Sequence, residues 1–90
     1  MPDDRLRALH DHLEATGERP VETSASRYLG EAQAVVADAL KPDTSEQVVQ
    51  ERVQQARKLL SHVDATGDER ADEHVAAARE CCAELLDNLN

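Results

Sequence analysis

Aromatic residues are almost absent from this 90-residue sequence. Tyr28 is the only one, since phenylalanine and tryptophan do not occur. Isoleucine is missing too, so the apolar side chains are ten Leu, eight Val and fourteen Ala. A core built from these residues is thin for a chain near the lower size limit of independently folding domains. We expect one domain, residues 1–90, that relies on helix propensity, a partner subunit or a stabilising solvent.

Long apolar runs and clusters of basic residues are also missing. No apolar stretch approaches the roughly 20 residues that a membrane span needs. Residues 1–4 lack the basic start and apolar segment of a signal peptide, so we expect a cytoplasmic protein with no membrane partner. Acidic and basic residues alternate, as in residues 68–73, whereas phosphate-binding surfaces need clustered Lys and Arg. We therefore expect no nucleic-acid partner.

Motifs for metals, cofactors and covalent catalysis are not found in the sequence. Cys81 and Cys82 are adjacent, whereas zinc sites use Cys pairs separated by two to four residues. Cys82 falls on an apolar helical stripe, where a buried thiol acts as a small hydrophobic side chain. The chain has no Gly-rich phosphate loop, nucleophile elbow or EF-hand pattern. We predict no catalytic, metal-binding or cofactor-binding residues, and no cofactor.

Negative charge is abundant. Asp and Glu total 19 against 10 Lys and Arg, which gives a net charge of −9. Only Lys41 and Lys58 are lysines. Such an excess repels itself in dilute buffer, whereas molar salt shortens the Debye length to about 3 Å and screens it. In composition the chain resembles small acidic uncharacterised proteins of haloarchaea, and this resemblance implies a salt-rich cytoplasm without implying an activity.

Apolar residues recur at spacings of three and four along most of the chain. This pattern predicts four helices, and no segment alternates with the period of two that a strand requires. The expected helices cover residues 3–16, 24–40, 45–65 and 69–89. The sequence therefore predicts an all-α fold, a short four-helix bundle.

Cap residues and glycines mark the expected helix ends. Thr23 or Ser24 is the expected N-cap of the second helix, and Thr44 with Gln47 fits a capping box at the third. Gly17 is expected in the left-handed conformation after the first helix, and Gly67 closes the third. Gly30 lies inside the second helix, which we explain by close packing against another helix.

A seven-residue motif occurs twice, fifty residues apart. Residues 12–18 read HLEATGE and residues 62–68 read HVDATGD. Two helical hairpins, one from the first two helices and one from the last two, explain this pseudo-repeat. They arose either by duplication or by convergence on a Gly-terminated helix end.

Histidine and arginine offer candidate site residues. A site built from His12, His62 and nearby carboxylates needs the two Gly-ended helix ends to meet. We favour the alternative that both histidines are structural or solvated, since His near a helix C-terminus interacts well with the dipole. Arg57 and His62 have a spacing similar to the short signature of HEPN-type ribonuclease domains. That resemblance implies Arg57 and His62 as a catalytic pair on a helical bundle.

Two functional hypotheses follow. The first is a non-enzymatic helical interaction module of a halophilic cytoplasm that self-associates, as a homodimer, or binds another protein. Its expected contact surfaces are the alanines of the second and fourth helices (Ala25, Ala32, Ala39, Ala71, Ala76, Ala77, Ala78 and Ala83). The alternative is a small metal-dependent or HEPN-like ribonuclease-type enzyme that uses Arg57 and His62, and it predicts that these side chains converge in a cleft.

Overall fold

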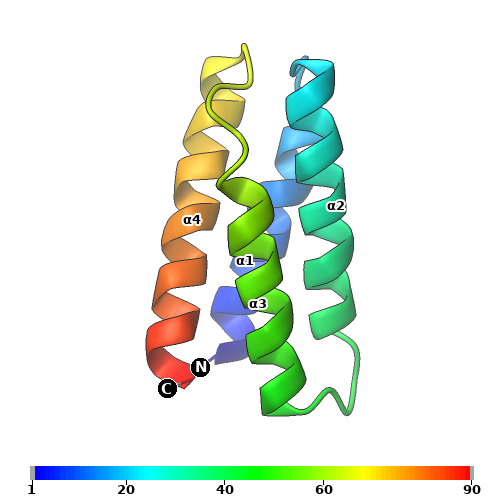
Figure 1. The fold of residues 1–90 in the computed structure, drawn as a ribbon, viewed down its shortest axis with the longest axis vertical. Helices are drawn as coiled ribbons and strands as arrows, with labels where there is room; N and C mark the ends of the chain where they lie inside the picture. The colour runs from blue at the N-terminus through cyan, green and yellow to red at the C-terminus, as the bar shows by residue number, and fades with distance from the viewer. Residues whose placement is uncertain (1, 90) are drawn as a thin grey trace.

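The computed structural model describes residues 2–89, and among them it contains four helices and no strand. The helices are α1 (Pro2–Thr16), α2 (Thr23–Ala39), α3 (Glu46–Leu60) and α4 (Glu69–Leu89). They run up, down, up and down in an elongated bundle that measures 35 × 20 × 19 Å (Figure 1). The predicted all-α four-helix bundle is confirmed.

The four helices form a closed ring of neighbours. Each helix packs on the next one in the chain, and α4 packs back on α1, while the diagonal pairs, α1 with α3 and α2 with α4, have no Cα atoms within 8 Å of each other in the described part of the chain. The most extensive packing is between α1 and α4 and between α2 and α3. The expected hairpins α1–α2 and α3–α4 are present, but each packs less extensively than these pairs.

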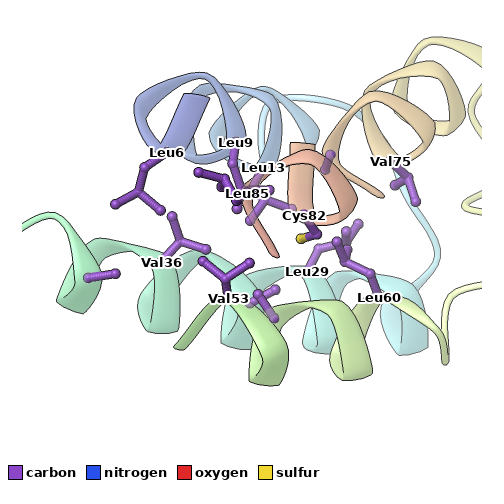
Figure 2. Packing of buried hydrophobic residues seen from close by; sticks show 14 of the residues in the cluster. Leu6, Leu9, Leu13, Leu29, Val36, Val53, Leu60, Val75, Cys82 and Leu85 are labelled. Atoms are coloured by element: carbon purple, nitrogen blue, oxygen red, sulfur yellow. The ribbon is translucent and has the colours of Figure 1, made fainter. Parts of the chain in front are cut away.

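Leucine, valine and alanine from all four helices fill the centre of the bundle (Figure 2). Leu9 and Leu13 from α1, Val36 from α2 and Leu85 from α4 have no exposed surface. The three- and four-residue spacings place these side chains on one face of each helix, as expected from the sequence. Tyr28, the single aromatic residue, is only half-buried at the edge of this cluster.

Helix α3 ends five residues before the predicted boundary at residue 65. Its last residue is Leu60, and Val63 is still buried although it lies beyond the helix. The Arg79 guanidinium of α4 donates hydrogen bonds to the carbonyl oxygen of Leu60, at 2.8 Å, and to that of Val63. Carbonyls at a helix C-terminus need such donors because no further helical N–H reaches them. A residue of another helix therefore caps α3 here.

The N-cap predictions for α2 and α3 are wrong in detail. Ser45, not Thr44, caps α3, and its hydroxyl accepts a hydrogen bond from the N–H of Val48 at 3.2 Å. Thr44 instead donates its hydroxyl proton to the carbonyl of Lys41 at 2.6 Å. The N-cap of α2 is Glu22, whose side chain makes no capping hydrogen bond. The start of α2 is held by the backbone instead, as described below.

Only one of the three glycines takes the left-handed conformation. Gly67 has φ of +85°, whereas Gly17 has no positive φ. The left-handed prediction for Gly17 is wrong because the chain leaves α1 through a tighter turn. The N–H groups of Gly17, Glu18 and Arg19 each donate to a carbonyl three residues earlier, which satisfies the end of α1 without a left-handed residue.

The two copies of the seven-residue motif lie at the same end of the bundle, near the top in Figure 1. They differ in backbone conformation, because His12 to Thr16 is helical and residues 62–66 belong to the α3–α4 linker. They match in burial, since Thr16 and Thr66 are both fully buried. The α1–α2 linker is tied to the α3–α4 linker at this end, where the N–H of Glu22 donates to the carbonyl of Thr66 at 2.8 Å.

Candidate functional site

Two histidines from different helices face each other between α1 and α4. The Nδ1 atoms of His12 and His74 are 3.0 Å apart, and both side chains are partly buried. The ring centroids are 5.2 Å apart, with an angle of 42° between the rings. A hydrogen bond at this distance requires one Nδ1–H donor and one bare Nδ1 acceptor. The arrangement therefore holds two imidazole nitrogens in a fixed, partly accessible position.

From the sequence, a site that joins His12 to His62 is the less favoured interpretation, and structural or solvated histidines are the favoured one. The structure places His12 against His74 and not against His62. His74 adjoins Val75, which belongs to the buried stripe of α4. Its partner depends on which helices are neighbours, and that information is not in the local pattern.

His62 lies elsewhere, beyond the end of α3. It is exposed, and its ring stacks on Tyr28 of α2 with a centroid distance of 5.0 Å and an angle of 21°. Arg57 is exposed in the last turn of α3, and no hydrogen bond or ion pair joins it to His62 within residues 2–89. Since α3 ends at Leu60, Arg57 lies on the helix and His62 lies beyond it.

A polar network joins the two linkers at the end of the bundle that carries Gly67. Arg19 donates from Nε and Nη2 to the two carboxylate oxygens of Asp68, at 2.9 and 3.1 Å. Asp68 also accepts from the N–H of Ala71 at 2.9 Å, as an N-cap of α4. The hydrogen bond from Arg19 is the largest cause that holds the pKa of Asp68 below its usual value, and the hydrogen bond from the N–H of Ala71 is the second. Thr66 completes the network through hydrogen bonds from its N–H and its hydroxyl to Asp72, both at 2.8 Å.

Neither cysteine is placed as a reactive thiol. Cys82 has no exposed surface, and burial raises the pKa of its thiol to about 12. Burial also raises the pKa of Cys81, with a further contribution from the nearby carboxylate of Glu84. Because the thiolate is the nucleophile, both sulfurs stay protonated and weakly reactive at neutral pH. The expectation that Cys82 serves as a small core residue agrees with its position.

Most of the alanines predicted to contact a partner are used inside the bundle. Ala25, Ala32 and Ala39 of α2 and Ala71 and Ala78 of α4 are all buried by the other helices. The prediction that these five form a contact surface is wrong, because alanine suits a close helix–helix contact equally well within a chain and between chains. Ala76 and Ala83 of α4 remain exposed.

A different set of small residues is exposed on α2. We call it the small-residue strip, and it comprises Thr23, Ser26, Gly30, Ala34 and Ala37, all exposed. Their spacings place them on one side of the helix, away from its buried face. A Cβ added at Gly30 would have no atom of the chain within 4 Å. The prediction that Gly30 packs closely against another helix of this chain is therefore wrong.

Several further features bear on what the surface can bind. A groove of about 340 Å³ lies at the opposite end from the linker network. It is lined by Leu6, Arg7, Ala39, Leu40, Lys41, Pro42, Asp43, Thr44 and Val49.

Within the described residues, no three or more His, Cys, Asp or Glu side chains are grouped to hold a metal ion. None of the helices between residues 2 and 89 has the length and apolarity that a membrane crossing requires.

Comparison with known proteins identifies a family for this chain. No curated protein and no solved structure matches the chain. The match is to a family model described as "Domain of unknown function (DUF8152)", and it covers residues 5–90. Since this match includes all four helices except the first residues of α1, the chain belongs to the DUF8152 family.

Proposed function

We propose that this chain is a non-enzymatic helical interaction module that self-associates through α2 in a salt-rich cytoplasm. The observation that carries the proposal is Gly30. A glycine inside a helix costs about 0.5–1 kcal/mol relative to alanine, and here nothing in the chain occupies the space beside it. A second helix approaching closely would use that space, as small residues allow helix backbones to come together.

A second copy of the chain is the partner that this surface fits best. Gly30 lies near the middle of α2, so the small-residue strip extends to both sides of it. A two-fold axis near Gly30 places two α2 helices antiparallel, so each copy uses the same surface. Arg27 and Glu31 are both exposed beside the strip. The antiparallel arrangement brings Arg27 of one copy toward Glu31 of the other.

The distribution of charge supports a salt-rich environment. Between residues 4 and 87 every acidic side chain is exposed except Asp68 and Asp72, which are half-buried. In that range only Asp38, Asp68 and Glu84 form ion pairs with Lys or Arg. The remaining carboxylates repel one another in dilute buffer, and two copies, each with a net charge of −9, also repel each other. Screening by molar salt removes most of this barrier to pairing.

The test is the molar mass in solution, measured by light scattering on a sizing column in about 2 M KCl and in dilute buffer. We expect twice the chain mass of 9.9 kDa in high salt and a shift toward monomer in dilute buffer. Gly30→Glu should be monomeric in both. Ala76→Glu is the matched control, since it adds the same charge at an exposed position of α4 and should leave the dimer intact.

Two results would contradict the proposal. A wild-type chain that is monomeric in high salt excludes self-association. A Gly30→Glu variant that still forms the dimer excludes the small-residue strip as the contact. Gly30→Ala distinguishes an effect on folding from an effect on dimerisation. Alanine has the higher helix propensity, so this variant should raise the free energy of unfolding of the monomer by about 0.5–1 kcal/mol.

A further inference from the structure

Two imidazole rings from the first and last helices direct the same ring atom at each other. His12 Nδ1 and His74 Nδ1 lie 3.0 Å apart, with the ring planes inclined by 42°. Neutral imidazole is the commonest metal ligand in proteins and binds through either Nδ1 or Nε2. We propose that His12 and His74 form a bidentate site for a divalent transition-metal ion between α1 and α4.

The distance between the nitrogens favours particular metals. With metal–nitrogen bonds of about 2.0–2.1 Å, a nitrogen–nitrogen distance of 3.0 Å gives an angle of about 91–97° at the metal. Such an angle suits the cis positions of a tetragonal or octahedral ion. Tetrahedral zinc needs the nitrogens to separate to about 3.3 Å. Cu²⁺ and Ni²⁺, which prefer tetragonal nitrogen and oxygen sites, therefore match the observed nitrogen–nitrogen distance better than Zn²⁺ does, and small rotations of the two rings would turn both lone pairs toward the ion.

The backbone around the pair is already fixed. Leu9 and Leu13 of α1 and Val75 and Ala78 of α4 are buried next to the two histidines, so the helix surfaces that carry the rings cannot shift freely. A site whose ligands are positioned beforehand loses little entropy when the ion binds. The rings themselves are only partly buried, so water can reach the remaining coordination positions.

Metal binding needs no net release or uptake of protons by the two rings. In the metal-free protein one ring carries its proton on Nδ1 and donates it to the bare Nδ1 of the other. When the ion binds, that proton is lost from Nδ1 and the Nε2 of the same ring takes one up. Both rings stay neutral, both Nδ1 lone pairs face the metal, and no net proton is released. The ion replaces a shared proton as the link between α1 and α4.

The test uses untagged protein and Ni²⁺, because a histidine tag would bind the ion and Cu²⁺ would oxidise thiols. Titration calorimetry at about pH 8 limits competition from protons. We expect one Ni²⁺ per chain, and a loss of affinity of at least about tenfold in His12→Gln and in His74→Gln, since either change leaves a single ligand. His10→Gln is the control, because His10 is also half-buried on α1 but faces Asp11 and Glu14. Its affinity should match that of the wild type.

The proposal is overturned if the wild type does not bind Ni²⁺, or if His10→Gln weakens binding as much as the two site variants. A second measurement needs no variant and so does not depend on how the variants fold. Nitrogen chemical shifts of ¹⁵N-labelled histidines, titrated with diamagnetic Zn²⁺, should move most at Nδ1 of His12 and His74. Shifts confined to Nε2, or to His10 and His62, would place the metal elsewhere and refute the assignment.

Discussion

Replacing Arg79 with methionine should destabilise the bundle although the residue is on the surface. Its guanidinium donates to the carbonyls of Leu60 and Val63, where α3 ends. A hydrogen bond from a charged donor contributes about 1.5–3 kcal/mol net. Arg79 itself is exposed, so water that enters its place can partly replace the lost donor, and we expect Arg79→Met to lower the free energy of unfolding by about 1–2 kcal/mol. For a domain of this size that corresponds to a loss of about 4–16 °C in Tm.

The assay is urea and thermal unfolding followed by circular dichroism, with Arg7→Met as the control. Arg7 is exposed on α1, and no hydrogen bond or ion pair of its side chain occurs within residues 4–87. The loss in Arg79→Met should persist in about 2 M KCl, because salt screens distant charges and not a hydrogen bond at contact distance. If Arg79→Met is no less stable than Arg7→Met, the hydrogen bonds from Arg79 to the end of α3 do not contribute to stability, and the reasoning is refuted.

Three further predictions concern other parts of the bundle. Gly67→Ala should cost about 1–2 kcal/mol in urea unfolding, because φ there is +85° and the new Cβ would lie 3.3 Å from a side-chain carbon of Glu22; an unchanged midpoint would contradict this. Cys82, with a pKa of about 12, should react with a thiol reagent at neutral pH only as fast as the chain unfolds, and mass spectrometry of a partly labelled sample should find Cys81 modified first. The pKa of Asp68 is lowered by Arg19, so its contribution to stability is complete above its ordinary value and is lost as pH falls through the lower, folded value. Arg19→Met should make the dependence of stability on pH shallower in that acidic range, and an equally steep dependence would argue against the ion pair.

The buried face of each helix could be predicted from spacing alone. Leu9 of α1, Val53 of α3 and Leu85 of α4 each belong to a series of apolar residues spaced by three and four, and none of the three has exposed surface. Such a pattern is local, and any helix that buries one face must show it. The existence and order of the four helices follow from it together with the positions of glycine and proline. The identity of the core therefore needed no knowledge of which helices are neighbours.

Features that depend on contacts between helices could not be predicted. The apolar stripe continues to Val63, whereas α3 ends at Leu60, where an arginine from α4 donates to the carbonyl oxygens. Alanine on a stripe has the same spacing whether it faces another helix of the same chain or a partner, and Ala25 turned out to be internal. The His12–His74 pair requires that α1 and α4 be side by side. The spacing of apolar residues within α1 or within α4 does not show that these two helices are neighbours.

The extensive packing between α1 and α4 has a consequence for folding. These two helices are the most distant in sequence, so their contact closes the longest loop that the described chain allows. During synthesis, the apolar face of α1 stays without its main neighbour until α4 has left the ribosome. A hairpin of α1 and α2 alone leaves Leu9 and Leu13 partly uncovered, so a stable partial fold is disfavoured. The bundle should therefore assemble late and in one cooperative step, and a nascent chain that stalls before α4 exposes leucines to chaperones and proteases.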